Sequence, residues 1–206
     1  MLDFAAIEKA PVAKAPFPHF LVEKALPRAA LDKVRRDFPA ITSHGVYPLA
    51  ELEYGPEFEG LIKDIQSDQL RDLIGQKLGV PMDGLPQMIT VRGRCAKKDG
   101  RIHTDSTDKV VTCLLYLNEA DWAEPSGRLR LLRSGTSLDD MIAEVPPNGG
   151  TLVVFKRTDN SWHGHHPFEG ERRYVMFNWV TSDVTLAKNL GRHKLSARLK
   201  RLLPFA

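Results

Sequence analysis

The chain has 206 residues, and its content of 42 % hydrophobic and 27 % charged residues is that of an ordinary globular domain. This length is enough to bury one sizeable core, and no run of about 18 apolar residues predicts a membrane span. The net charge is +3, and its basic excess lies in residues 181–206, which hold six Lys or Arg and one acid. The rest of the chain has 23 bases and 25 acids, so a nucleic-acid surface spread over the whole protein is not expected.

The first 84 residues are predicted to be mostly helical. A short strand-like run, Pro16–Val22, precedes an amphipathic helix over Pro27–Phe38, and residues 40–56 are expected to form a loop. Apolar residues at helical spacing then predict two short helices between Phe58 and Leu78, with Ser67 placed to cap the second.

Residues 85–182 have a different character, because short runs rich in β-branched and aromatic residues alternate with turn residues. Without long helical patterns between them, such runs predict an antiparallel barrel or jelly roll. Only residues 137–144 are expected to form a short helix in this part. The fold class is therefore mainly β with a helical annex: a double-stranded β-helix core on which the N-terminal helices pack, in a single domain. The predicted strands are Met88–Arg94, Val110–Leu117, Arg128–Leu132, Gly150–Phe155 and Arg173–Val180.

The last segment, residues 183–206, is predicted to form a basic C-terminal helix. Lys188–Leu203 has helical spacing, with leucines on one side and Lys and Arg on the other. We expect the leucine stripe to dock on the body of the protein. The alternative is a helix that binds an anionic membrane surface or a nucleic acid.

Cysteine usage indicates a reducing compartment. Cys95 and Cys113 are too few for a disulfide framework, and neither has a Cys or His at zinc-finger spacing. Met1–Phe4 also lacks the basic and apolar start of a secretory signal. We therefore expect a cytoplasmic protein in which both cysteines are small packing residues.

The chemical motif of the chain is His103-x-Asp105. Residues two apart on an extended segment point to the same side, so this imidazole and this carboxylate can reach one metal ion. A later segment offers His163, His165 and His166 as a further ligand. Two histidines and one carboxylate form the facial triad of non-haem Fe(II) oxygenases, which leaves three octahedral positions open for cosubstrate and O₂.

From about Met88 to Trp179 the sequence resembles the 2-oxoglutarate/Fe(II)-dependent dioxygenases of the prolyl 4-hydroxylase type. The resemblance implies a jelly-roll enzyme with Fe(II), 2-oxoglutarate as cosubstrate, O₂, and ascorbate as a supporting reductant. It implies oxidative decarboxylation to succinate and CO₂, coupled to hydroxylation of a substrate. The motifs that carry it, in order, are His103-x-Asp105, Val111–Asn118 ending in Tyr-Leu-Asn, Ser126–Leu131, Gly149–Phe155, His163 with Pro167, and Gly170–Arg173 leading to Trp179.

The resemblance assigns His103, Asp105 and His163 as the metal ligands. On composition alone His165 and His166 compete for the third position, but only His163 has a Trp before it and a Pro four residues after it, as in the family. No catalytic side chain beyond the metal ligands is expected.

A cosubstrate anchor is expected at the start of the last strand, because a guanidinium binds a carboxylate through two parallel hydrogen bonds. Alternation lets only one of Arg172 and Arg173 face the barrel interior. The Gly-x-Arg spacing of the family favours Arg172, whereas the ten-residue step from His163 favours Arg173, which we prefer. With Arg173 inside, strand alternation also turns Val175, Phe177 and Trp179 inward and Asn178 outward. The resemblance makes Tyr116 a second ligand of the same carboxylate.

The walls of the pocket and the substrate are less defined. Thr112 and Leu129 are expected nearby, and Arg92 and Arg94 stand where the family commonly has a tyrosine, so they are candidates to contact an anionic substrate or the cosubstrate.

The substrate itself, a small molecule, glycan or protein side chain selected by residues 40–56 and 118–126, is not identified by any motif. The alternative function is a cupin-like metal barrel, an isomerase or sensor without oxygenase activity.

Overall fold

The structure is a computed structural model that describes residues 1–119, 121–184, 186–187 and 190–191. The predicted C-terminal helix lies mostly outside these residues. Every helix in the described part of the chain is too short or too polar to cross a lipid bilayer. The elements are α1 (Phe4–Lys9), β1 (His19–Val22), α2 (Arg28–Arg36), β2 (Tyr47–Pro48), the 3₁₀ helix η1 (Leu49–Glu51), α3 (Pro56–Ile65), α4 (Asp68–Leu78), β3 (Gln87–Cys95), β4 (Lys109–Tyr116), β5 (Leu129–Leu132), β6 (Met141–Val145), β7 (Leu152–Lys156), β8 (His163–Gly164) and β9 (Gly170–Val180).

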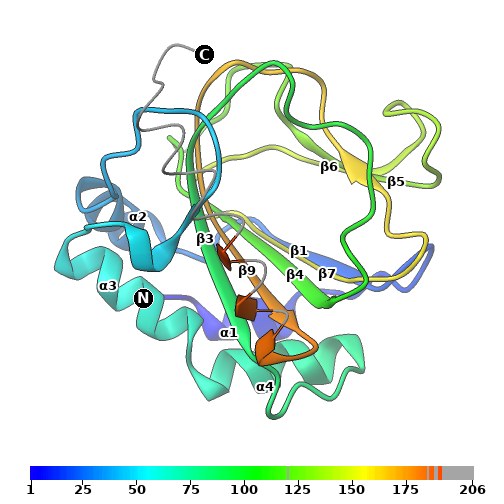
Figure 1. The fold of residues 1–206 in the computed structure, drawn as a ribbon, viewed down its shortest axis with the longest axis horizontal. Coiled ribbons are helices and arrows are strands. Elements are labelled where there is room, and N and C mark those ends of the chain that lie inside the picture. Colours follow the sequence, from blue (N-terminus) through cyan, green and yellow to red (C-terminus); the bar gives the residue numbers. More distant parts are fainter. Residues whose placement is uncertain (120, 185, 188–189, 192–206) are drawn as a thin grey trace.

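Two antiparallel sheets form the core. The larger sheet has six strands in the order β1-β7-β4-β9-β3-β2, and the smaller has the order β6-β5-β8. Strands far apart in sequence, such as β3 and β9, lie side by side and pair, as in a jelly roll (Figure 1). The predicted fold class, a mainly β jelly roll with helices, is confirmed.

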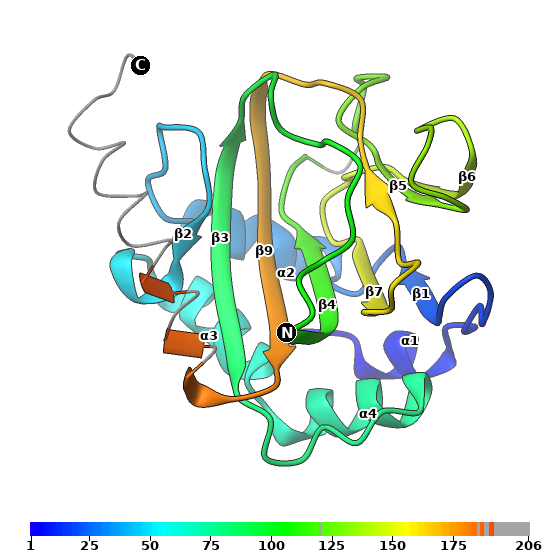
Figure 2. The ribbon, with the colours of Figure 1, turned by 45° about the vertical axis from the view of Figure 1, so that its right-hand side comes forward.

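The larger sheet is buried on both faces. Helices cover one face, where Val175, Phe177 and Trp179 of β9 join the same apolar cluster as the buried residues of α3 and α4. The smaller sheet lies on the other side (Figure 2), and there Tyr174 of β9 packs in a second cluster with Leu129 of β5. Successive residues of β9 therefore face two different layers, the helices and the interior of the barrel. The interior of the barrel is the less apolar of these two layers.

The helical part agrees with the sequence patterns. Ser67 caps α4 as expected, since its Oγ accepts a hydrogen bond from Leu70 N at 3.2 Å. Gly79 ends the helix in a left-handed conformation with φ +63°. The short helix α1 and the two-residue strands β2 and β8 were not predicted.

The helix expected over residues 137–144 is wrong. Met141–Val145 form β6, which pairs with β5 so that Glu144 lies opposite Arg130. Arg130 Nε donates to Glu144 Oε1 at 2.8 Å across this pair. Cross-strand pairing of this kind overrides the weak local preference of a polar segment for a helix.

Candidate metal centre and cosubstrate pocket

A cavity of about 240 Å³ lies between the two sheets. Its lining includes His103, Asp105 and His163, together with Arg172. The segments that supply these side chains are far apart in the sequence, and the strand pairing of the two sheets brings them together. The larger sheet supplies Arg172 from β9, and β8 of the smaller sheet supplies His163.

The two histidines are placed by a pair of backbone hydrogen bonds. His103 N donates to His163 O and His163 N donates to His103 O, each at 3.0 Å, and the ring centroids lie 4.3 Å apart. Asp105 follows two residues later on the same side of the chain. One possible ligand atom from each of the three residues lies within 4.8 Å of the other two, so the triad expected from the sequence is assembled in space.

Both imidazoles are held in the tautomer that suits a metal ligand. His103 Nδ1 donates to Arg101 O at 2.8 Å and His163 Nδ1 donates to Ser161 O at 2.9 Å. A carbonyl oxygen only accepts, so Nδ1 carries the proton and Nε2 keeps its lone pair. Burial lowers the pKa of His163 to about 4, despite the opposing effect of Asp105, so its ring is neutral at physiological pH.

Asp105 is held as a carboxylate by its neighbours. Burial would raise its pKa, but the charge of Lys109 and that of His163 when protonated outweigh this and keep it well below the usual range. Lys109 Nζ donates to Oδ1 at 2.7 Å and Thr112 Oγ1 donates to Oδ2 at 2.6 Å. Asn178 Nδ2 donates to Thr112 Oγ1 at 2.8 Å, which directs the hydroxyl proton of Thr112 toward Asp105.

We predict that Thr112→Val weakens metal binding, because Asp105 loses the donor that orients its Oδ2. Loss of such an outer-shell hydrogen bond costs about 10- to 100-fold in metal affinity. Titration of the metal-free protein with Mn(II) measures the change. Thr112→Ser keeps the hydroxyl and is expected to restore the affinity. Equal losses in both variants would show that Thr112 acts only through packing.

Arg172 is the one buried cation of this cavity with no acidic partner in the part of the chain that the structure describes. Its side chain is 2 % exposed, Nε donates to Gly127 O at 2.8 Å, and Nη2 donates to the Tyr116 hydroxyl at 3.0 Å. The guanidinium also lies 5.1 Å from the Tyr116 ring centroid and 5.3 Å from that of Tyr174. Burial raises the pKa of Tyr116 to about 12, despite the opposing charge of Arg172, so its hydroxyl keeps a proton to donate.

The preference for Arg173 over Arg172 is corrected by this geometry. Arg173 points to the other face of β9, where its guanidinium lies 5.1 Å from the centroid of the Phe38 ring and Nη2 donates to Glu171 at 3.0 Å. It shares that face with Val175, Phe177 and Trp179, which pack on the helices. Asn178, expected to face outward, lies instead on the cavity side and is fully buried.

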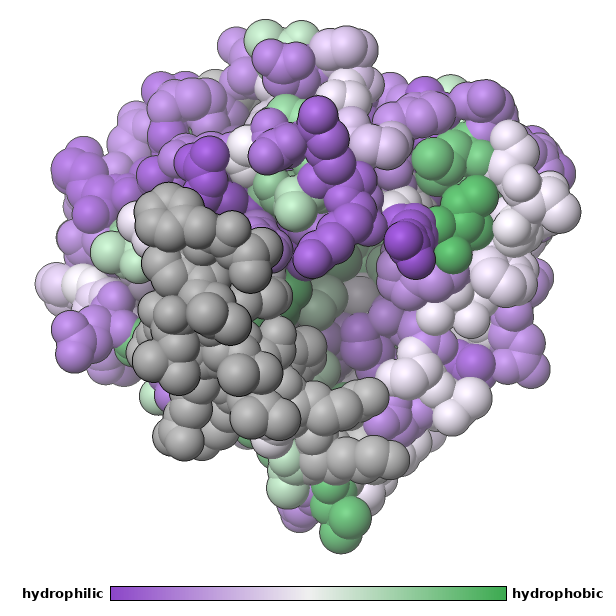
Figure 3. Space-filling model, turned by 45° about the horizontal axis from the view of Figure 1, so that its top comes forward, coloured by the Kyte–Doolittle hydropathy of each residue, from purple (hydrophilic) through white to green (hydrophobic). Residues whose placement is uncertain are grey.

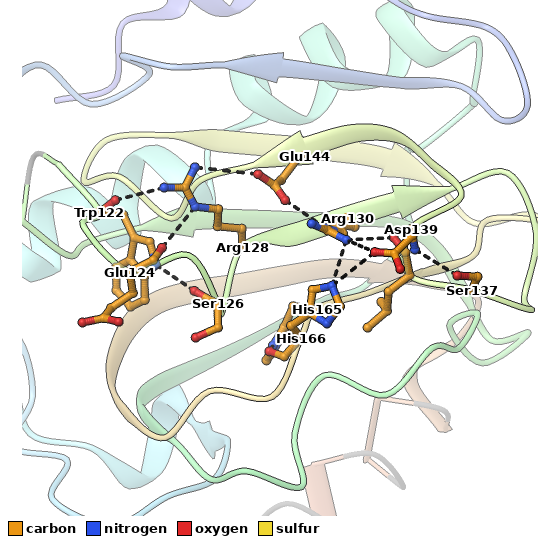
Figure 4. A network of polar contacts seen from close by, with 11 residues as sticks. Trp122, Glu124, Ser126, Arg128, Arg130, Ser137, Asp139, Glu144, His165 and His166 are labelled. Atoms are coloured by element: carbon orange, nitrogen blue, oxygen red, sulfur yellow. Dashed lines mark hydrogen bonds and ion pairs between the residues drawn. The ribbon is translucent and has the colours of Figure 1, made fainter.

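The remaining candidate histidines lie on two sides of one segment. His165 is buried in the cavity wall, and its Nδ1 donates to His166 O at 2.8 Å. His166 belongs to a polar network centred on Arg130, whose Nη1 contacts His166 Nε2 at 2.9 Å and Asp139 Oδ1 at 2.8 Å (Figure 4). Neither His165 nor His166 belongs to the ligand cluster among the described residues.

The cavity also holds residues that no sequence motif indicated. Lys109, four residues after Asp105, and Asp99, which forms an ion pair with Arg92, both line it. For Lys109, the signal available in the sequence is its position four residues after Asp105. Thr112, Leu129 and Arg92 line the cavity, whereas Arg94 is exposed.

Residues 93–181 match the profile of the 2OG-Fe(II) oxygenase superfamily, a span that contains all three candidate ligands and Arg172. The chain carries a 2OG-Fe(II) oxygenase domain. Residues 93–181 thus have the sequence of a 2-oxoglutarate-dependent dioxygenase domain, and Fe(II) and 2-oxoglutarate are the cofactor and cosubstrate of this family. No curated protein matches the chain by sequence.

Solved structures of this oxygenase fold resemble the chain over most of its length. A prolyl-4-hydroxylase from Pseudomonas putida is 22 % identical with a TM-score of 0.56, over 86 % of this chain and 99 % of that one. The viral collagen prolyl hydroxylase of Paramecium Bursaria Chlorella virus-1, in a 2-oxoglutarate complex, is 15 % identical with a TM-score of 0.55, over 79 % and 96 %. HygX from Streptomyces hygroscopicus, with nickel and 2-oxoglutarate bound, is 15 % identical with a TM-score of 0.53, over 80 % and 83 %.

Proposed function

We propose that this oxygenase hydroxylates a substrate C–H bond, with Fe(II) held by His103, Asp105 and His163 and the C5 carboxylate of 2-oxoglutarate held by Arg172 and Tyr116. The observation that carries this proposal is the buried guanidinium of Arg172, which faces the same cavity as the triad and has no carboxylate partner among the described residues. Leaving a charge buried without a counterion costs several kcal/mol. A dianionic cosubstrate supplies the missing charge.

The donor set fits Fe(II), because two neutral imidazoles and one carboxylate bind this ion without saturating it. When bound, the iron supplies the redox chemistry by which 2-oxoglutarate and O₂ give succinate, CO₂ and one oxygen atom for the substrate. The protein's own groups bind and orient. Arg172 offers two donors to the carboxylate and Tyr116 a third, while Leu114, Leu129 and Met176 line the cavity and exclude water.

The experiment is succinate release by purified protein supplied with Fe(II), ascorbate and 2-oxoglutarate. We expect slow uncoupled turnover, and loss of both turnover and metal binding in His103→Ala and Asp105→Ala. A metabolite and peptide library then identifies the substrate by coupled turnover; peptidyl proline, the substrate named for the structurally similar hydroxylases, is one class to include. Full metal affinity in both variants would contradict the ligand assignment.

A cupin-like isomerase or sensor is the rival to be excluded. Such a barrel has no use for a dicarboxylate cosubstrate, so its thermal stability in Mn(II) does not respond to 2-oxoglutarate. We expect the unfolding temperature of this protein to rise when 2-oxoglutarate is added to the Mn(II)-loaded form, since a ligand that binds only the folded state stabilises it.

A further inference from the structure

Four exposed cations lie in the stretch of chain between Arg92 and His103, two residues that line the cavity. We call Arg94, Lys97, Lys98 and Arg101 the basic rim; all four side chains are exposed. The stretch that carries them starts two residues after Arg92 and ends two residues before His103, both of which line the cavity. Asp99 and Gly100, within the stretch, line it as well. Lys97, Lys98 and Arg101 therefore belong to a loop that forms one side of the cavity, and Arg94 lies near the end of β3 that leads into this loop.

Packing fixes this loop against the segment that carries the third ligand. Gly100 O accepts a hydrogen bond from His165 N at 2.8 Å. A Cβ on Gly100 would lie 2.4 Å from His165 Nδ1, and φ at Gly100 is +87°, so the close approach requires glycine.

The acids near the basic rim do not neutralise it. Asp99 is the acid within the stretch, and it is engaged by Arg92 Nη1 and by Ala96 N. Lys97 lies 3.9 Å from Glu169, and both side chains are more than half exposed, so this pair is weak. Within the described part of the chain Arg94, Lys98 and Arg101 have no ion-pair partner. Unpaired cations beside a cavity raise the local concentration of anions.

The cavity is too small to enclose a whole substrate together with the cosubstrate. Its volume of about 240 Å³ is below the roughly 300–1,000 Å³ usual for a drug-sized ligand alone. The part of the substrate beyond the reacting carbon must then stay outside, at the mouth. The surface there is not apolar: hydrophilic residues border much of the hollow seen in the space-filling view (Figure 3).

We propose that the basic rim binds carboxylate groups of the substrate that lie beside a reacting carbon that reaches into the cavity. This inference rests on the proposed hydroxylase function. Carboxylates of this kind come from acidic side chains of a polypeptide or from a free polycarboxylate. In both, Lys98 and Arg101 supply long-range attraction and hydrogen bonds that a neutral amide does not match.

The test uses the full chain loaded with Mn(II) and saturating 2-oxoglutarate. Fluorescence anisotropy measures binding of a labelled decapeptide of alternating Glu and Gly and of its Gln counterpart. The variant Lys98→Glu/Arg101→Glu reverses the charge at two rim positions, and Lys9→Glu/Lys24→Glu is the control, because it makes the same change of net charge at two exposed lysines outside the rim. Competition by tricarballylate distinguishes a free polycarboxylate from a polypeptide source.

We expect the Glu peptide to bind at least tenfold more tightly than the Gln peptide, with the advantage lost in the rim variant and kept in the control. Added salt should weaken binding, since exposed charges are screened over about 10 Å at 0.1 M. No binding, equal binding of the two peptides, or tighter binding of a single-stranded oligonucleotide would overturn the proposal. Failure of the proposed function shows separately, as a wild type that releases no succinate.

Discussion

His163→Ala is expected to lower the affinity for Mn(II) by more than about 100-fold, since even outer-shell losses cost 10- to 100-fold. The ring is buried, its Nδ1 is held by Ser161 O, and its Nε2 is left to face the other ligands. The two residues that remain, His103 and Asp105, do not form a facial triad. Titration of metal-free protein with Mn(II), followed by electron paramagnetic resonance, measures the loss.

The matched control is His166→Ala. This imidazole comes from the same segment but contacts Arg130 and Asp139 on the outer side, so we expect its removal to leave the Mn(II) affinity within about twofold. Removing a buried ring also costs stability, and chemical unfolding of both metal-free variants separates that cost from the binding effect. If His165→Ala lost Mn(II) binding and His163→Ala kept it, the third ligand would be His165.

The grouping of the three candidate ligands could be predicted because its evidence is local. His103 and Asp105 are two residues apart on an extended segment, and the neighbours of His163 match a family pattern. What sequence does not show is the means of assembly: the reciprocal backbone hydrogen bonds that place His103 beside His163 span 60 residues. Long-range pairing of this kind depends on the register of whole strands.

The arginine pair at the start of β9 illustrates where such reasoning fails. The apolar alternation of Val175, Phe177 and Trp179 is typical of a barrel interior, and it predicts that Arg173 lies inside. In the structure those three side chains pack on the helices, and the cavity side carries Arg172, Tyr174 and Asn178. A strand buried on both faces does not show from hydrophobicity alone which face holds the site.

A local irregularity adds to the ambiguity at this point. The pairing of β3 with β9 shifts register between Arg92 and Arg94, because Arg92 lies opposite Tyr174 and Arg94 opposite Glu171. The bulge places one extra residue in β9 at the arginine pair. Bulges near active sites re-aim side chains. A count of residues from His163 along the sequence does not reveal a bulge, so it does not show which arginine faces the cavity.

Arg172→Leu is expected to weaken 2-oxoglutarate binding to the Mn(II)-loaded protein by about 30-fold or more, since losing one partner of a buried charge pair costs roughly 2–5 kcal/mol. The matched control is Arg173→Leu, the same change one residue along the strand. Its guanidinium contacts Phe38 and Glu171 outside the cavity, so the dissociation constant should stay within about twofold. Isothermal titration calorimetry with 2-oxoglutarate measures both without any turnover. The reverse order of effects would restore Arg173 as the anchor.

Stability in the absence of ligand provides the decisive second readout. A buried guanidinium without a carboxylate partner is a cost in the free protein, so Arg172→Leu should unfold at the same temperature as the wild type or higher before 2-oxoglutarate is added. On addition, the wild type gains stability and the variant gains little. A purely structural arginine, bound to Gly127 O and the Tyr116 hydroxyl for packing alone, would instead lower the unfolding temperature when replaced. A variant that unfolds no lower than the wild type without 2-oxoglutarate, but lower than the wild type with it, thus identifies Arg172 as a charge kept for its ligand.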